Sequence, residues 1–106
     1  MSHEATVTDA ELSEAIVWGL SHGSPQGAPI LSEQKMIARY GVERAAVLLA
    51  AIRPLLHESG NMPIDWQKSD WQQAGDLVHS EMQRRHPSLS DDALQALRGY
   101  FMFQTR

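Results

Sequence analysis

The segment from residue 42 to residue 56, VERAAVLLAAIRPLL, constrains the fold more than any other part of the chain. Wound into a helix, it points apolar side chains in every direction, and a helix that is apolar all round is either buried or spans a membrane. A bilayer needs about 20 consecutive apolar residues, whereas this shorter run contains Glu43, Arg44 and Arg53. The segment therefore predicts a buried central helix in a soluble, all-α domain.

Size and composition favour one domain with a core of its own. The chain has 106 residues, of which 42% are hydrophobic, so we expect a single helical domain over residues 1–106. It has no cysteine, which excludes disulfides, thiolate catalysis and cysteine-based metal sites. No run of 18 apolar residues occurs, and the acidic N-terminus lacks the order of a signal peptide, so we expect a cytoplasmic protein.

Local signals in the first third predict a helix followed by a loop. Thr8 precedes a stretch in which apolar residues recur at helical intervals, and Glu11 completes the spacing of a capping box. We therefore expect a helix at about 9–22, after a disordered tail at 1–7. Residues 23–31 begin with GSPQGAP, whose glycines and prolines do not sustain a helix, so we expect a flexible loop there.

Two further helices are predicted to meet at Gly41. Ser32 is expected to cap the first of them. Pro54 is expected to kink or break the second near residues 50–53, because proline lacks an N–H and clashes with the preceding turn.

The last third predicts two more helices. Ser69 begins a capping-box pattern ahead of a helix at about 70–85, and Ser90 is expected to cap a helix that starts with two aspartates. Gly99 weakens that last helix, so YFMF at 100–103 is either its last turn or an extended tail. Together these segments predict a compact bundle of four to five short helices around the central one.

Residues 32–52 have the order of a helix-turn-helix, which is a short helix, a turn with glycine and a second helix. Within them, ARYGVERAAV at 38–47 resembles the turn and the start of the recognition helix in bacterial helix-turn-helix regulators. The resemblance covers about a fifth of the chain. It implies that Arg39, Glu43 and Arg44 would contact DNA.

Three features depart from the pattern of those regulators. After Arg44 the helix offers only Ala, Val, Leu and Ile until Arg53, whereas a recognition helix presents polar side chains to bases and phosphates. Ile37 stands where those regulators usually have a small residue. The net charge of −4 is also unfavourable for a nucleic-acid partner, and only residues 32–60 carry a slight basic excess. DNA binding is therefore kept as the alternative function.

Motifs for catalysis or metal binding are weak. The serines stand mostly at predicted helix caps, and no phosphate-binding glycine loop or nucleophile elbow is present. Asp76 and His79 lie three residues apart and could share a metal, but such a pair is also common on a solvated helix face. We expect no enzyme activity, no metal and no cofactor.

Aromatic residues in the second half of the chain are the strongest functional signal. Trp66 and Trp71 flank the start of a predicted helix, and Tyr100 and Phe103 belong to YFMF. Consecutive large apolar residues project around a helix, so one face cannot bury them all. The side chains left outside would form a patch for a partner, whereas the alternative is that they fill the core.

Acidic neighbours suggest what such a patch would bind. Asp70, Asp91 and Asp92 lie close to the aromatic residues in the sequence and would steer a basic partner toward them. We therefore predict an acidic protein–protein interaction module that neutralises or regulates a basic protein, or that associates with itself as a dimer.

Overall fold

The computed structural model describes residues 7–105, and these residues form five α-helices and no strand. All but the last residue of the predicted disordered tail at 1–7 lie outside the described residues. The all-α prediction is confirmed for the described part of the chain. The helices are α1 (Asp9–His22), α2 (Glu33–Tyr40), α3 (Val42–Gly60), α4 (Trp71–Arg85) and α5 (Asp91–Thr105).

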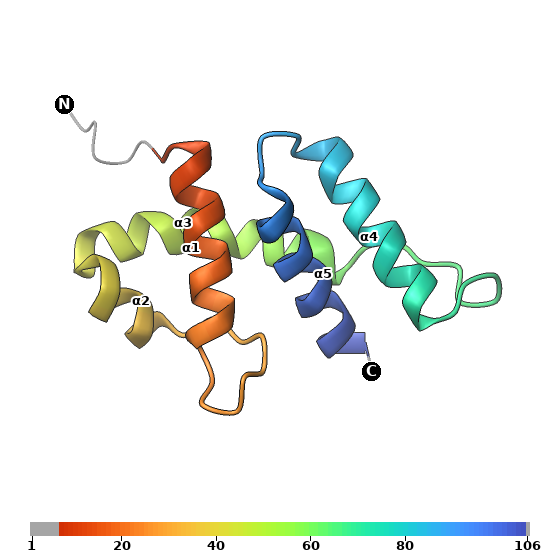
Figure 1. Cartoon of the computed structure of the whole chain (residues 1–106), viewed down its shortest axis with the longest axis horizontal. Helices are drawn as coiled ribbons and strands as arrows, with labels where there is room; N and C mark the ends of the chain where they lie inside the picture. The colour runs from red at the N-terminus through yellow and green to blue at the C-terminus, as the bar shows by residue number, and fades with distance from the viewer. Residues whose placement is uncertain (1–6, 106) are drawn as a thin grey trace.

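The helices form two layers (Figure 1). The longest helix, α3, runs along the molecule, and α1 and α5 lie side by side across it. One end of the molecule is closed by α2, which packs on α3, and the other by α4, which packs on α5. The shortest extent of the molecule is 19 Å, which matches two layers because packed helices lie about 8–10 Å apart.

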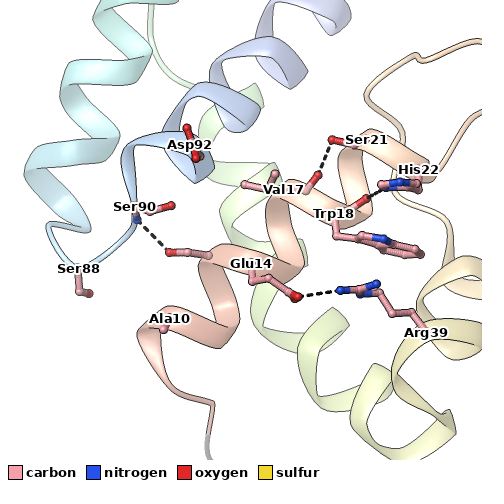
Figure 2. Close-up of a pocket in the computed structure, with 11 residues that line it drawn as sticks. Ala10, Glu14, Val17, Trp18, Ser21, His22, Arg39, Ser88, Ser90 and Asp92 are labelled. Carbon is pink, nitrogen blue, oxygen red and sulfur yellow. Dashed lines mark hydrogen bonds and ion pairs between the residues drawn. The ribbon is translucent and has the colours of Figure 1, made fainter.

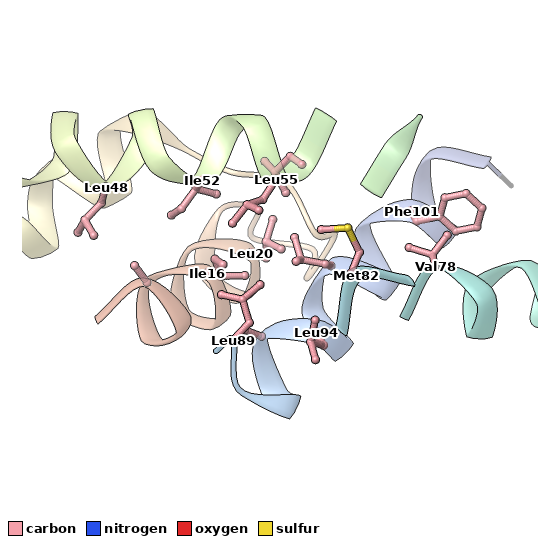
Figure 3. Close-up of a cluster of buried hydrophobic side chains, with 14 of the residues drawn as sticks. Ile16, Leu20, Leu48, Ile52, Leu55, Val78, Met82, Leu89, Leu94 and Phe101 are labelled. Carbon is pink, nitrogen blue, oxygen red and sulfur yellow. The ribbon is translucent and has the colours of Figure 1, made fainter. Parts of the chain in front are cut away.

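The core lies where α1, α3 and α5 meet. Figure 3 shows Ile52 and Leu55 of α3 directed toward Ile16 of α1, with side chains of α5 completing the cluster. Each fully buried aliphatic side chain of this kind contributes about 1.5–3 kcal/mol to the free energy of unfolding. This packing fixes α1 and α5 next to each other and leaves their outer faces to the solvent.

The central helix is buried on one face only. Leu48, Leu49 and Ile52 are buried, whereas Ala46 and Ala50 are exposed and Val42 has 68% of its surface exposed. The prediction of a helix enclosed on all sides followed from counting alanines as core residues. Because a methyl group is small, exposing it is tolerated, and the other helices cover α3 from one side.

Most of the predicted helix starts are confirmed. The hydroxyls of Thr8, Ser32 and Ser90 each accept a hydrogen bond from the backbone N–H three residues later, at 3.1, 3.3 and 3.1 Å. The cap of α4 is displaced by one residue, because Asp70 rather than Ser69 accepts the hydrogen bond, from the N–H of Gln73 at 2.8 Å. The Gln73 side chain accepts the N–H of Asp70 at 2.9 Å, which completes a capping box.

Pro54 and Gly99, the two residues expected to weaken a helix, do not end one. The helix α3 continues through Pro54 to Gly60, so of the kink or break predicted near residues 50–53 the break does not occur. Both Pro54 and Ala50 are exposed, so water can reach the Ala50 carbonyl that loses its donor. Similarly, α5 continues through Gly99, and residues 100–103 lie in its last turns, which is the first of the two predicted alternatives.

The segment between α1 and α2 is a loop, as predicted. Its two ends touch, since a Cβ added to Gly23 would lie 1.5 Å from the carbonyl oxygen of Ile30. Only glycine allows this contact, which holds residues 27–31 beside α5. Among the described helices, none is long and apolar enough to cross a membrane.

Candidate functional site

One line of α5 side chains faces away from the core. It consists of Asp92, Ala96, Gly99 and Phe103, which we call the α5 outer line. Their spacing of four, three and four residues places them on one face of the helix. Asp92 is exposed and the other three are half-buried, whereas the opposite face carries buried residues such as Leu94 and Leu97. The outer line is therefore on the face of α5 opposite the core.

A groove runs along this line. A hollow of about 440 Å³ lies between α5 and the loop, and it is lined by Pro29, Trp71, Ala96, Gly99 and Phe103 among others. A neighbouring hollow of about 270 Å³ is lined by Ile30, Leu56 and Tyr100 together with Arg53. The two hollows share Pro29 and Phe103. We call them together the α5 groove.

The floor of the α5 groove is open at Gly99. A Cβ added there would have no atom within 4 Å. Gly19 and Gly75 differ, since a Cβ at either would lie 2.8 Å from a neighbouring side chain. These two helical glycines are therefore explained by close packing inside the chain. Gly99 is not, although glycine inside a helix lowers stability by about 0.5–1 kcal/mol relative to alanine.

Not all of the predicted aromatic residues line the groove. Trp71, Tyr100 and Phe103 line the α5 groove, whereas Trp66 does not. The Trp66 ring, 51% of whose residue surface is exposed, stacks on Phe101 with 6.4 Å between ring centroids. The structure thus brings together three of the four aromatic residues that the sequence singled out.

Trp71 forms one wall of the groove and is fixed from within the chain. Its Nε1–H donates a hydrogen bond to Thr105 Oγ1 at 3.3 Å, yet 41% of the residue surface remains exposed. The polar edge of the indole is therefore satisfied while its apolar surface faces the solvent, as is typical of an interface residue.

The predicted acidic residues have different roles. Asp70 caps α4, and Asp91 lies 3.2 Å from His79 Nε2. The side chain of Asp92 makes no hydrogen bond or ion pair within residues 7–105. Asp92 is thus the one of the three that is available to a partner, and it stands at the N-terminal end of the α5 outer line.

A third hollow, of about 650 Å³, lies beside Asp92 on the outer face of α1 (Figure 2). Its apolar walls include Ala10, Val17 and Trp18. Figure 2 shows Trp18 between His22 and Arg39. The His22 ring stacks on the indole at 4.5 Å, and the Arg39 guanidinium carbon lies 4.9 Å from the ring centroid. Both contacts hold the indole in place at the edge of the hollow.

Glu14 completes this cluster around Trp18. It accepts hydrogen bonds from the Tyr40 hydroxyl and from Arg39, the latter at 2.9 Å, and these lower the pKa of the Glu14 carboxyl. Sequence reasoning missed the cluster, since its members come from two helices and no local spacing links Trp18 to Arg39. The Glu14–Trp18–His22 spacing of four residues was the only local signal.

The two arginines of the DNA-binding alternative pair with carboxylates of α1. Arg39 pairs with Glu14, and Arg44 donates from Nε to Glu11 Oε2 at 2.8 Å, with a second hydrogen bond to the other carboxylate oxygen. Glu43 is exposed. Since a carboxylate compensates each arginine within the chain, no observation here favours a DNA-binding surface, and that alternative stays a prediction.

Asp76 and His79, the pair that could share a metal, contact different residues of α5. His79 contacts Asp91, whereas Asp76 accepts a hydrogen bond from Arg98 at 3.1 Å. In the described part of the chain no group of three or more His, Cys, Asp or Glu side chains could hold a metal ion.

Comparison of the chain with protein-family models, with curated proteins and with solved structures found no match. The shape and chemistry of the α5 groove are therefore the basis for a function. It is exposed, largely apolar and lined by Trp71, Tyr100 and Phe103.

Proposed function

We propose that the protein is a protein-binding module whose α5 groove accepts an apolar segment of another polypeptide. The observation that carries this proposal is the convergence of Trp71, Tyr100 and Phe103 on one exposed groove with an open glycine floor. Grooves of this kind are typical docking sites for the apolar face of a helix.

The energetics of such a groove are those of an interface. Tryptophan and tyrosine dominate binding energy at protein–protein interfaces, because their large apolar surfaces lose water on docking. Trp71 has 41% of its surface exposed, and its truncation to alanine is expected to weaken binding by about 2 kcal/mol. The stability of the free protein should change much less, because the exposed part of the ring packs on nothing.

If the partner is a different protein, the charge of this chain favours a basic one. The chain carries a net charge of −4, and Asp92, at the N-terminal end of the α5 outer line, has no partner within residues 7–105. A basic protein would therefore be steered toward the groove and would associate faster at low salt. Neutralising or regulating such a protein is the form of the function that fits these charges.

The test is affinity capture with matched variants. Tagged wild-type protein, Trp71→Ala and Leu77→Ala are compared in extracts of the source cell that also contain the untagged chain. Leu77 is the control, since 43% of its surface is exposed and it lies on α4 outside the groove. Proteins captured by wild type and by Leu77→Ala should be lost with Trp71→Ala, while circular dichroism stays unchanged. Equal capture by all three proteins would contradict the proposal.

A further inference from the structure

We propose that the occupant of the α5 groove is a second copy of this chain, with the two α5 helices packed antiparallel about a twofold axis. The inference rests on the proposed function, because it takes the α5 groove to be a docking site. It adds the identity of the partner and the register of the contact.

The α5 outer line is complementary to itself in this arrangement. Asp92 and Phe103 stand at its ends, and Ala96 and Gly99 lie symmetrically between them. If the twofold axis passes midway between Ala96 and Gly99, each of these small residues faces the other one in the second copy. Small side chains at the crossing allow two helices to approach closely, which accounts for the open space at Gly99.

The same register brings Phe103 of one copy to the hollow of about 650 Å³ in the other. Phe103 lies about 16 Å along the helix from Asp92, given a rise of 1.5 Å per residue. In the antiparallel pair, Phe103 of one copy therefore reaches the Asp92 end of the other. There the hollow of about 650 Å³ offers the apolar surfaces of Val17 and Trp18. Each copy thus supplies the half-buried Phe103 ring at one end of its α5 outer line and apolar surface at the other.

Charge selects the antiparallel direction. Arg53 lines the groove near Phe103, and Asp92, at the other end of the α5 outer line, lines the hollow of about 650 Å³. Both are exposed, and neither side chain has an ion-pair partner within residues 7–105. Antiparallel packing brings Arg53 of each copy toward Asp92 of the other, twice by symmetry, whereas parallel packing would bring like charges together.

A charge-swap series on the full-length protein tests the inference. Sedimentation equilibrium over a range of concentrations should show a monomer–dimer equilibrium for wild type. Asp92→Arg and Arg53→Glu should each raise the dimer dissociation constant about tenfold, because like charges then meet at both ends. The double variant, in which the charges are exchanged, should return close to wild type. Glu43→Arg is the control, since it changes the net charge as Asp92→Arg does but lies outside the groove.

A second variant separates folding from assembly. Gly99→Glu places two like charges near the twofold axis and should give a monomer. Its circular dichroism should remain that of wild type, because glutamate is a good helix former and the position is open. The inference is overturned if wild type stays monomeric at every concentration, or if Gly99→Glu dimerises like wild type. The proposed function fails separately, if Trp71→Ala captures the same proteins as wild type.

Discussion

Gly75 of α4 lies against Met102 of α5, and a Cβ on Gly75 would sit 2.8 Å from the Met102 sulfur. The Nε atom of Arg98 would be 3.2 Å away. This close approach fixes α4, which begins at Trp71, against α5. The position of one wall of the groove therefore depends on a glycine that the chain itself requires.

Alanine at Gly75 and at Gly99 should have opposite effects on stability. Gly75→Ala forces Met102 to move and should lower the free energy of unfolding by about 1–3 kcal/mol. Gly99→Ala meets no atom and should raise it by about 0.5–1 kcal/mol through helix propensity. Both are measured by urea unfolding in the Arg53→Glu background at low protein concentration, where the weakened dimer contributes least. An equal increase for the two variants would mean that α4 and α5 are not as close as described.

The hydroxyl of Ser13 should contribute to stability although it is small. Ser13 is buried in α1, and its Oγ accepts the backbone N–H of Ser90 at 2.9 Å, which ties α1 to the start of α5. Ser13→Ala leaves that N–H without an acceptor and should lower the free energy of unfolding by about 1–2 kcal/mol. The midpoint temperature of thermal unfolding should then fall by several degrees. The control, Ser21→Ala, should change little, because the exposed Ser21 hydroxyl donates to Val17 in its own helix.

The two tryptophans near α4 should separate binding from stability. Trp66 stacks on the buried Phe101, so Trp66→Ala should lower the free energy of unfolding by about 0.5–1.5 kcal/mol and leave self-association unchanged. Trp71→Ala should weaken self-association with a smaller effect on stability. Urea unfolding and sedimentation equilibrium on both variants provide the measurements. If Trp66→Ala weakens association as much as Trp71→Ala, the interface extends beyond the groove.

Glu81 should contribute to the way in which the free energy of unfolding falls at acidic pH. Hydrogen bonds from Arg84 and Arg85 lower the pKa of its carboxyl from 4.5 to about 2. Because the folded protein holds this carboxylate at a lower pKa than the unfolded chain, the stabilisation is complete above about pH 4.5 and is lost as the pH falls toward 2.

Removing that carboxylate should change the slope below pH 5. Unfolding free energies of Glu81→Gln, measured from pH 6 to pH 2, should fall less steeply than those of wild type. Glu43→Gln serves as the control, because Glu43 is exposed and makes no ion pair within residues 7–105. Parallel profiles for wild type and Glu81→Gln would show that the pairs with Arg84 and Arg85 do not persist in solution.

Local signals account for most of what could be predicted. Thr8, Ser32 and Ser90 cap helices as expected, because capping depends on residues within one turn. Ser69 was the wrong cap for α4, since Ser69 and Asp70 can both cap and each has a glutamine three residues later. The one-residue difference is below what a local pattern can distinguish.

Contacts between helices could not be predicted from the sequence. The place of Trp18 between His22 and Arg39 depends on how α1 lies beside α2, and no spacing encodes that. The stacking of Trp66 on Phe101 likewise removes one predicted aromatic residue from the patch. The alanines of α3 were counted as core because a pattern records which residues are apolar, whereas burial depends on which sides other helices cover.

The central claim, that two α5 helices pack antiparallel in the groove, is tested most directly by cross-linking. The chain has no cysteine, so single-cysteine variants report one site each. A mixture of Ala96→Cys and Gly99→Cys proteins should form a disulfide-linked heterodimer rapidly under mild oxidation, because these positions face each other across the axis. If the mixture cross-links no faster than Val42→Cys, which lies exposed on α3, the two α5 helices do not pair.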